Sequence, residues 1–292
     1  MKITNEQNLP YGLVKAVSPE PHNAQGCISA TTLIQGIKQI LLTQRHWDEL
    51  VDDVSNRIWA VFGTAVHSLL ESEGENDFTE IEMKKKVGSI FVTGKIDNYN
   101  MAEGIICDYK TTSVYKVKAE EFDDWFQQGM IYAWLLKKNN LPVSKCRFIA
   151  MLKDYSLSEA SRNSAYPQKP VYVYEFNVTE DRLAKIEEFI TTKVSEYEKL
   201  IKVPDDEIPA CTEQERWAKK SVFAVMKKGR KTAVKLFNLK EDAESYLTDL
   251  GKDHFLEYRP GESTRCKSYC LCAKFCNYYN TVEKAATLNM VA

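Results

Sequence analysis

The sequence contains no long apolar run and no leader-like start, which narrows the classes of protein it can specify. None of its hydrophobic stretches approaches the roughly 20 residues that a membrane-spanning helix needs. The first residues, MKITNEQNLPYG, lack the apolar segment of a secretory signal. We therefore expect a cytoplasmic protein with no membrane association.

The sequence also has little net charge. Its 39 Lys and Arg residues against 41 Asp and Glu residues give a formal net charge of −2. The chain as a whole therefore has no electrostatic attraction for nucleic acid, and any such contact would depend on local basic segments. Three segments qualify, residues 84–86, 219–220 and 227–231, although each is equally compatible with an ordinary solvated face.

Internal repeats, low-complexity tracts and flavin or nicotinamide fingerprints are absent as well, which disfavours a redox protein. What is present is a chain of 292 residues with 44% hydrophobic and 27% charged residues, typical of a globular protein. We expect an irregular arm over residues 1–28, a core over 29–202, and a smaller module over 203–292 that begins with the linker VPDDEIP.

Hydrophobic periodicity and capping residues predict the elements of these segments. Helices are expected near residues 29–42, 47–60, 63–71, 119–139 and 179–202, and strands near 78–87, 90–97, 104–110, 146–155 and 171–178. In the smaller module we expect a helix at 213–219, a hairpin over 223–238, a helix at 239–250 and a strand at 254–260.

The stretch GKIDNYNMAEGIICDYKTT, residues 94–112, carries the most distinctive chemistry. Asn98, Asn100 and Gly104 lie between two β-branched runs, which predicts an antiparallel hairpin. Because side chains alternate along a strand, Asp108 and Lys110 project from one face, and we expect Asp97 to reach that face too. Buried charges must be paired or must bind a metal ion, so the group predicts a functional site.

Such a group suits metal-assisted hydrolysis of a phosphodiester. Asp97 and Asp108 would anchor a divalent ion, with the Tyr109 carbonyl as a further oxygen ligand. Lys110 would orient or deprotonate the attacking water, or offset charge that grows in the transition state. The alternative is a surface hairpin whose charged residues only face solvent.

Two helical stretches carry further polar pairs. His67 and Glu71 are four residues apart, as are Gln128 and Tyr132, so each pair shares a helix face. His67 by itself is compatible with an ordinary hydrogen-bonded histidine near a surface. Gln128 and Tyr132 need partners if they are covered, which a phosphate, a base edge or the backbone would provide.

Four of the eight cysteines fall within eleven residues near the C-terminus. Cys266, Cys270, Cys272 and Cys276 give the spacing C-x3-C-x-C-x3-C. In a chain without an export signal this clustering favours a metal site over disulfides. Thiolates suit a [4Fe–4S] cluster and Zn²⁺ equally. The remaining interpretation is that these cysteines are reduced and bind no metal.

Together these motifs resemble the PD-(D/E)xK nuclease superfamily in its RecB-like exonuclease branch. The order is G-x-x-x-H-x-x-L-E, then G-x-x-D, then D-x-K, then Q-x-x-x-Y, and the likeness covers about residues 29–200. These motifs fall on Gly63, His67, Leu70 and Glu71, on Gly94 and Asp97, on Asp108 and Lys110, and on Gln128 and Tyr132. The resemblance implies a mixed α/β fold, with a central mixed sheet flanked by helices in a restriction-endonuclease-like core, and a small C-terminal module that bears the cysteines.

The resemblance also implies roles for the residues that match. His67, Asp97 and Asp108 would bind Mg²⁺ or Mn²⁺, and Lys110 would be catalytic. Gln128 and Tyr132 would contact DNA near the scissile phosphate. Glu71 would be a reserve ligand or a partner of His67.

The C-terminal cysteines resemble the iron–sulfur site of RecB-like nucleases, in which one cysteine precedes the nuclease core and three follow it. Cys266, Cys270 and Cys276 match the following three. The sequence departs from the pattern because no cysteine lies in the expected helix over residues 33–42. Cys211 is the preferred fourth ligand, with Cys272 and Cys27 as alternatives, and the site is expected to be a structural staple.

The expected function is that of a metal-dependent DNA nuclease, most simply an exonuclease that acts at DNA ends in recombination, repair or phage DNA metabolism. A recombination or helicase protein is an expected partner. The alternative is a non-catalytic DNA-binding or assembly factor that retains the nuclease fold. The sequence leaves open the choice between exonuclease and endonuclease, the polarity and the oligomeric state.

Overall fold

The computed structural model describes residues 1–17, 26–70 and 78–283. The chain forms two compact units. The first consists of Met1–Gln35 and Val51–Lys202, and the second of Gly36–Leu50 and Val203–Ala292. The second unit therefore takes one segment, residues 36–50, from within the region expected to belong to the nuclease core.

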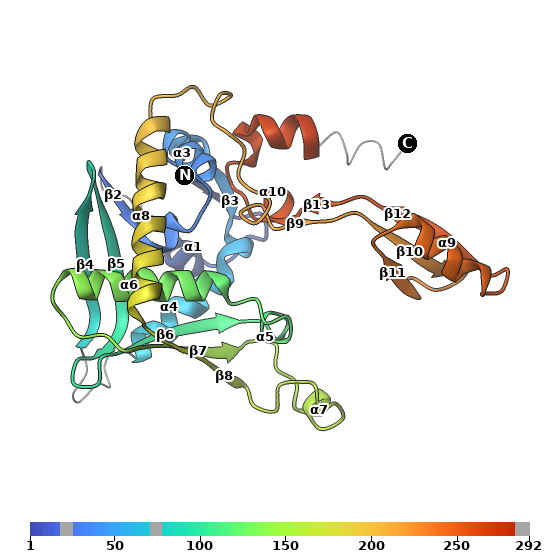
Figure 1. Ribbon diagram of the computed structural model, residues 1–292, viewed down its shortest axis with the longest axis horizontal. Coiled ribbons are helices and arrows are strands. Elements are labelled where there is room, and N and C mark those ends of the chain that lie inside the picture. Colours follow the sequence, from blue (N-terminus) through green and yellow to red (C-terminus); the bar gives the residue numbers. More distant parts are fainter. Residues whose placement is uncertain (18–25, 71–77, 284–292) are drawn as a thin grey trace. The chain divides into compact units, whose positions relative to one another are not determined.

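The first unit is built on a six-stranded mixed sheet (Figure 1). Its strand order is β2-β5-β6-β7-β8, and β4 pairs with β5 outside this path. The β2–β5 and β6–β7 pairs are parallel and the other pairs are antiparallel. The strands are β2 (Cys27–Ser29), β4 (Phe78–Val87), β5 (Ile90–Asn100), β6 (Ile105–Thr112), β7 (Lys145–Leu152) and β8 (Val171–Asn177). A separate parallel pair joins β1 (Lys2–Thr4) and β3 (Val51–Asp53).

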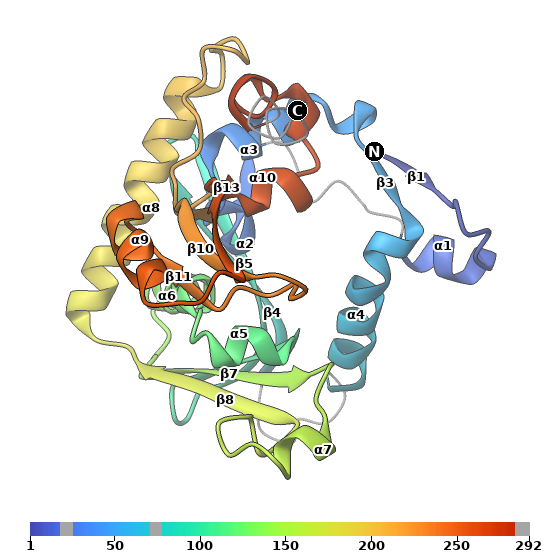
Figure 2. The same ribbon diagram turned by 90° about the vertical axis from the view of Figure 1, so that its right-hand side faces the viewer.

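Alternation along the strands decides which residues enter the core. In β7 every second residue, from Cys146 to Leu152, is buried. The buried side chains pack against α6 (Asp123–Lys138), where the ring of Trp125 stacks on Phe148 with centroids 5.8 Å apart. Helix α8 (Glu180–Leu200) packs beside α6, and Figure 2 shows α4 (Ile58–Leu70) on the other side of the sheet from α8. The expected mixed sheet flanked by helices is confirmed.

The helix expected over residues 47–60 was wrong. The segment instead forms a 3₁₀ turn, η1 (Trp47–Glu49), then β3, then a second 3₁₀ turn, η2 (Val54–Arg57), and only then enters α4. Asp53 explains the break, because its carboxylate accepts hydrogen bonds from both the backbone N–H and the hydroxyl of Ser55. Such local side-chain bonds compete with helix formation.

Two other expected helices differ from the prediction, because the backbone leaves the helical conformation within each expected range. The first continues from α2 (Ala30–Leu33), which Ser29 caps, to α3 (Ile37–Arg45), with an interruption at residues 34–36. The helix expected from residue 119 begins at Asp123, because Glu120 adopts a φ of 53° after α5 (Val114–Lys118). The remaining helices of the first unit are α1 (Tyr11–Val17) and α7 (Leu157–Ala160). No helix in the described ranges is long and apolar enough to cross a bilayer.

The second unit combines α3 and η1 with the C-terminal segment. A three-stranded antiparallel sheet of order β11-β10-β12 contains the hairpin that the sequence predicts. Residues 213–219, expected to be helical, instead form turns that lead into β9. The elements are β9 (Ala218–Lys219), β10 (Val222–Lys227), β11 (Lys235–Phe237), α9 (Lys240–Thr248), β12 (His254–Arg259), β13 (Glu262–Ser263), α10 (Thr264–Ser268), η3 (Ala273–Phe275) and η4 (Tyr279–Glu283).

Candidate active site

The site lies where β5 and β6 separate. The two strands pair from Asn100↔Ile105 to Asn98↔Cys107, and the ladder ends there, just before Asp97 and Asp108. Asp97 Oδ2 accepts a hydrogen bond of 2.8 Å from the Tyr109 N–H. A side chain therefore replaces the missing ladder bond, which satisfies the backbone donor and fixes the carboxylate at the opening between the strands.

Helix α4 brings His67 to this opening. Its Nε2 lies 2.9 Å from the Tyr109 carbonyl oxygen, and its Nδ1 lies 3.4 Å from Asp97 Oδ1. The hydrogen bond to Asp97 raises the pKa of His67, against the opposing effect of burial. The Tyr109 carbonyl, which the sequence offered as a metal ligand, is thus the acceptor that orients the imidazole.

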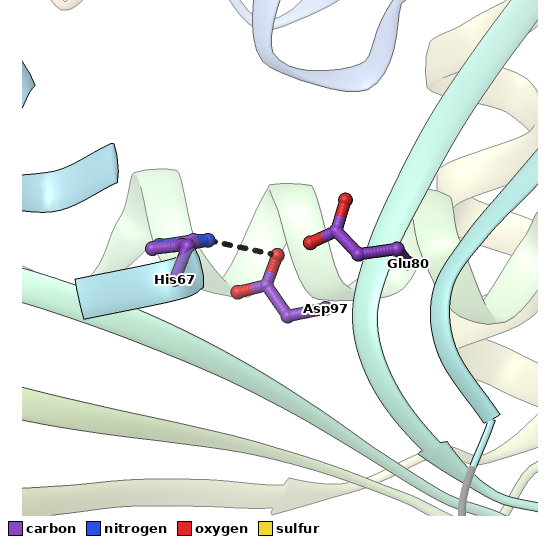
Figure 3. Close-up of side chains that lie close together, drawn as sticks. All are labelled: His67, Glu80 and Asp97. Atoms are coloured by element: carbon purple, nitrogen blue, oxygen red, sulfur yellow. Dashed lines mark ion pairs between the residues drawn. The ribbon is translucent and has the colours of Figure 1, made fainter. Parts of the chain in front are cut away.

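Glu80 completes this group, and sequence reasoning missed it. One ligand atom from each of His67, Glu80 and Asp97 lies within 4.8 Å of the others (Figure 3). Glu80 stands between the pairs Thr79↔Asn98 and Ile81↔Ile96, so it lies opposite Asp97. Counting residue by residue outward from the turn between β4 and β5 pairs Glu80 with Asp97, so the sequence contained a signal for this position.

The backbone at Glu80 is unusual for a strand. Its φ of 54° is left-handed, a conformation that non-glycine residues seldom adopt and that clusters at functional sites. The side chain is ion-paired with Lys95, which lies two residues before Asp97 on β5. Glu71, the reserve ligand expected from the sequence, lies outside the described residues.

Asp108 and Lys110 share a face of β6, as alternation predicts. Asp108 is 1% exposed, and Lys110 Nζ lies 2.5 Å from its Oδ1. Gln128 Nε2 donates to the other oxygen of Asp108 at 3.1 Å. Burial raises the pKa of Asp108 to about 6, although the Lys110 ammonium acts in the opposite direction.

Asp97 and Asp108 have different neighbours in the site. Asp97 Oδ1 lies 3.4 Å from His67 Nδ1 on α4, whereas Asp108 accepts a hydrogen bond from Gln128 on α6. This placement explains why Asp108 does not belong to the close group formed by His67, Glu80 and Asp97.

Gln128 and Tyr132 are both buried in this arrangement. Gln128 Nε2 donates to the Tyr132 hydroxyl at 2.8 Å as well as to Asp108. Burial raises the pKa of Tyr132, so its hydroxyl stays neutral and remains able to donate. The pair therefore holds Asp108 in place, and its contact with DNA stays a prediction.

Gly94 offers a test of this packing. A Cβ at this position would lie 2.7 Å from Leu135 Cδ1 and 2.9 Å from Tyr132 Cδ1. We expect Gly94→Ala to lower the free energy of unfolding by about 1–3 kcal/mol, since overpacked cores lose stability in this range. Urea unfolding measures the change. Gly12→Ala is the control, because nothing lies within 4 Å of its Cβ position; equal stability of the two variants would contradict the packing argument.

The second unit contains a separate cysteine pocket. Five cysteines line it, Cys211, Cys266, Cys270, Cys272 and Cys276. Cys270 Sγ and Cys272 Sγ are 3.4 Å apart. Cys27, an alternative ligand suggested by the sequence, lies instead on β2 of the first unit.

Helix α3 forms part of the wall of this pocket. A Cβ on Gly36, at the start of α3, would lie within 2.4 Å of Cys211 Sγ, so glycine makes room for the cysteine. Lys38 is buried, and its Nζ donates to the carbonyls of Asp205 and Ile208 and to Asn277 Oδ1 at 2.7–2.9 Å. These bonds join α3 to both ends of the C-terminal segment.

Comparison with known proteins supports the same interpretation. The profile of the PD-(D/E)XK nuclease superfamily matches residues 38–277. No curated protein matches the chain.

Solved structures with similar folds include three proteins of low sequence identity. A protein designated SSO0001 has a TM-score of 0.45 and 19% identity, over 66% of this chain and 84% of that chain. A phage-related exonuclease from Haemophilus somnus 129PT has a TM-score of 0.39 and 13% identity, over 60% and 94%. The alkaline exonuclease LHK-Exo from Laribacter hongkongensis has a TM-score of 0.38 and 8% identity, over 60% and 90%. These likenesses concern the fold alone.

Proposed function

Because the chain belongs to the PD-(D/E)XK nuclease superfamily, we propose that it is a divalent-metal-dependent deoxyribonuclease that hydrolyses phosphodiester bonds at DNA ends. One observation carries the proposal. The close group of His67, Glu80 and Asp97 lies beside the ion pair of Asp108 and Lys110, at the point where β5 and β6 separate.

The donor atoms of this site fit Mg²⁺ or Mn²⁺. Two carboxylates suit either ion, and an imidazole nitrogen favours Mn²⁺. His67, Glu80 and Asp97 would hold the ion, and Asp108 would add a further donor. A bound divalent ion supplies charge neutralisation at the scissile phosphate and activation of the attacking water.

The protein groups position and support this chemistry. The His67 Nε2–H donates to the Tyr109 carbonyl, which leaves Nδ1 directed at the ligand group. Lys110 is the cation nearest Asp108, and it would orient or deprotonate the water or offset the charge that develops on the phosphate. Gln128 and Tyr132 act as positioning residues for Asp108.

Glu80→Gln tests the assignment of the third ligand. We expect the affinity for Mn²⁺, measured by calorimetry, to fall at least about tenfold, because the amide replaces a charged oxygen donor. Glu82→Gln is the matched control, since Glu82 is exposed on the same strand and is not in the ligand group. If both variants bind Mn²⁺ like the parent protein, Glu80 is not a ligand.

End-labelled linear DNA and covalently closed circular DNA distinguish the modes of cleavage. With Mg²⁺ or Mn²⁺ we expect the linear DNA to be degraded from its ends and the circle to stay intact. Nicking of the circle would show that the protein is an endonuclease rather than an exonuclease. Binding in EDTA without cleavage of either substrate would instead identify a non-catalytic DNA-binding factor. Processing of ends fits recombination, repair or phage DNA metabolism, with a recombination or helicase protein as partner.

We also propose that the cysteine pocket holds a [4Fe–4S] cluster through Cys211, Cys266, Cys270 and Cys276, with Cys272 in reserve. Tetrahedral Zn²⁺ with Zn–S bonds of about 2.3 Å requires sulfurs about 3.8 Å apart. Among the described residues, no three cysteine sulfurs lie within 4.8 Å of one another. Lys38, Arg216 and Arg265 line the pocket and would offset the charge of metal-bound thiolates.

A further inference from the structure

A concentrated basic surface lies at one end of the β11-β10-β12 sheet. The hairpin between β10 and β11 turns at Gly229, whose φ is 79°, and the cations around it are exposed. The Lys228 N–H donates to the Asp253 carbonyl at 2.8 Å, which brings the segment before β12 against this turn. We call the group the basic turn; it consists of Lys227, Lys228, Arg230, Lys231 and Lys252.

No ion pair neutralises the basic turn in the part of the chain that the structure describes. In residues 1–17, 26–70 and 78–283, no carboxylate lies within 4.0 Å of any of its five cationic groups. Asp253 is the single carboxylate in residues 227–231 and 252–254, so these segments carry a formal net charge of +4. Some other exposed lysines are ion-paired, as Lys137 is with Glu180, Lys185 with Asp181 and Lys240 with Glu244.

The sheet face opposite α9 carries two exposed apolar side chains near the basic turn. Helix α9 covers the opposite face, where the rings of Tyr246 and Phe237 have centroids 5.3 Å apart. Leu236 precedes Phe237 and therefore projects from the face without a helix. Leu236 pairs with Ala224 and Phe255 pairs with Met226. Ala224 and Met226 are two residues apart on β10, so Leu236 and Phe255 project from the same face. Phe255 is 42% exposed and Leu236 is 53% exposed.

The chain enters and leaves this sheet at one place. β9 and β13 pair through Ala218↔Ser263 and Lys219↔Glu262. The sheet and α9 therefore form an insertion between Cys211 and Cys266 of the cysteine pocket. Neither α9 nor the β10–β11 turn contributes a residue to that pocket, so the basic turn has no role in holding its contents.

We propose that the basic turn and Phe255 bind a single DNA strand, with the strand's phosphates on the cations and one base stacked on the Phe255 ring. Unpaired cations beside an exposed aromatic ring are the combination that holds single-stranded nucleic acid without sequence preference. A local cationic surface is also what a chain of net charge −2 needs to attract a polyanion. The inference rests on the proposed nuclease function, and it adds a contact surface separate from the nuclease site.

The charge contribution is tested with the triple variant Lys228→Ala, Arg230→Ala, Lys231→Ala. Fluorescence anisotropy with a labelled single-stranded oligonucleotide in EDTA measures binding without cleavage. We expect the affinity to fall at least about tenfold, and the slope of log affinity against log salt to fall by about 2, because each phosphate contact on a single strand contributes about 0.7.

The matched control is Lys137→Ala, Lys185→Ala, Lys240→Ala, which removes the same total charge from lysines that are already ion-paired. We expect this control to bind within about twofold of the parent protein. If the two triple variants bind equally, the effect is one of net charge and the inference is overturned. A variant that loses binding to anionic vesicles but not to DNA would overturn it too.

Phe255→Ala tests the stacking contact. We expect it to weaken binding to the single strand about tenfold and to leave binding to a blunt duplex unchanged, since only unpaired bases can stack on the ring. Equal binding of this variant and the parent protein to the single strand would contradict the inference. Failure of the nuclease proposal is separate: it would appear as absence of cleavage by the parent protein while these binding differences persist.

Discussion

Lys110→Ala is expected to lower the rate of DNA cleavage by about a thousandfold or more. Lys110 Nζ lies 2.5 Å from Asp108 Oδ1, and it is the ammonium placed to act on the water or on the developing phosphate charge. Single-turnover cleavage of end-labelled linear DNA with saturating Mn²⁺ measures the chemical step. Lys116→Ala is the control, because that lysine is similarly buried and is ion-paired with Asp124.

The stability of the Lys110→Ala variant separates a catalytic role from a structural one. Removing Lys110 leaves a buried carboxylate without its counter-ion, which costs about 3–5 kcal/mol when the charge is retained. The pKa of Asp108 is already about 6. Because its folded pKa lies above the unfolded value, Asp108 favours the folded state most at low pH, where it is neutral. This contribution to stability is lost as the pH rises from about 4 to about 6.

The variant should therefore unfold much like the parent protein at pH 5 and less stably than the parent at pH 8, as measured by urea titration. Cleavage should remain absent at pH 7 in protein that is demonstrably folded by circular dichroism. Retained cleavage in folded Lys110→Ala would remove the proposed mechanism. A large loss of stability at pH 5 would show that the ammonium is needed for packing rather than for the charge of Asp108.

Cys266→Ser is expected to have the second large effect, loss of the bound metal together with destabilisation of the second unit. Ligation of metal contributes directly to folding, so its removal should lower the free energy of unfolding by several kcal/mol. The visible spectrum and the iron and zinc content of anaerobically purified protein report occupancy. Cys107→Ser is the control, because Cys107 lies on β6 in the first unit.

Two further substitutions assign the fourth ligand. Cys211 lies against Gly36 at the start of α3, the helix in which a leading cysteine was expected and is missing. We expect Cys211→Ser to lose the metal and Cys272→Ser to keep it. The opposite result would transfer the role to Cys272, and parent protein that contains neither iron nor zinc would refute the metal site.

The sequence by itself determined the features that depend on close neighbours along the chain. Period-two alternation places Asp108 and Lys110 on one face, and the ion pair between them confirms it. Ser29 and Thr179 cap their helices by the same local rule, because each hydroxyl accepts a hydrogen bond from a backbone N–H three residues on. The ordered motifs identified the superfamily for the same reason, since each is a short pattern on one element.

The tertiary structure alone decided how distant segments meet. Glu80 enters the site through strand register and a left-handed backbone, and packing brings His67 on α4 to Asp97 and Gln128 on α6 to Asp108. Cys211 takes its place beside α3 through packing between segments that are far apart in the sequence, at residues 36 and 211. Local patterns reflect the geometry of one strand or helix, whereas these contacts depend on twist, splay and packing between elements, which no short window of sequence contains.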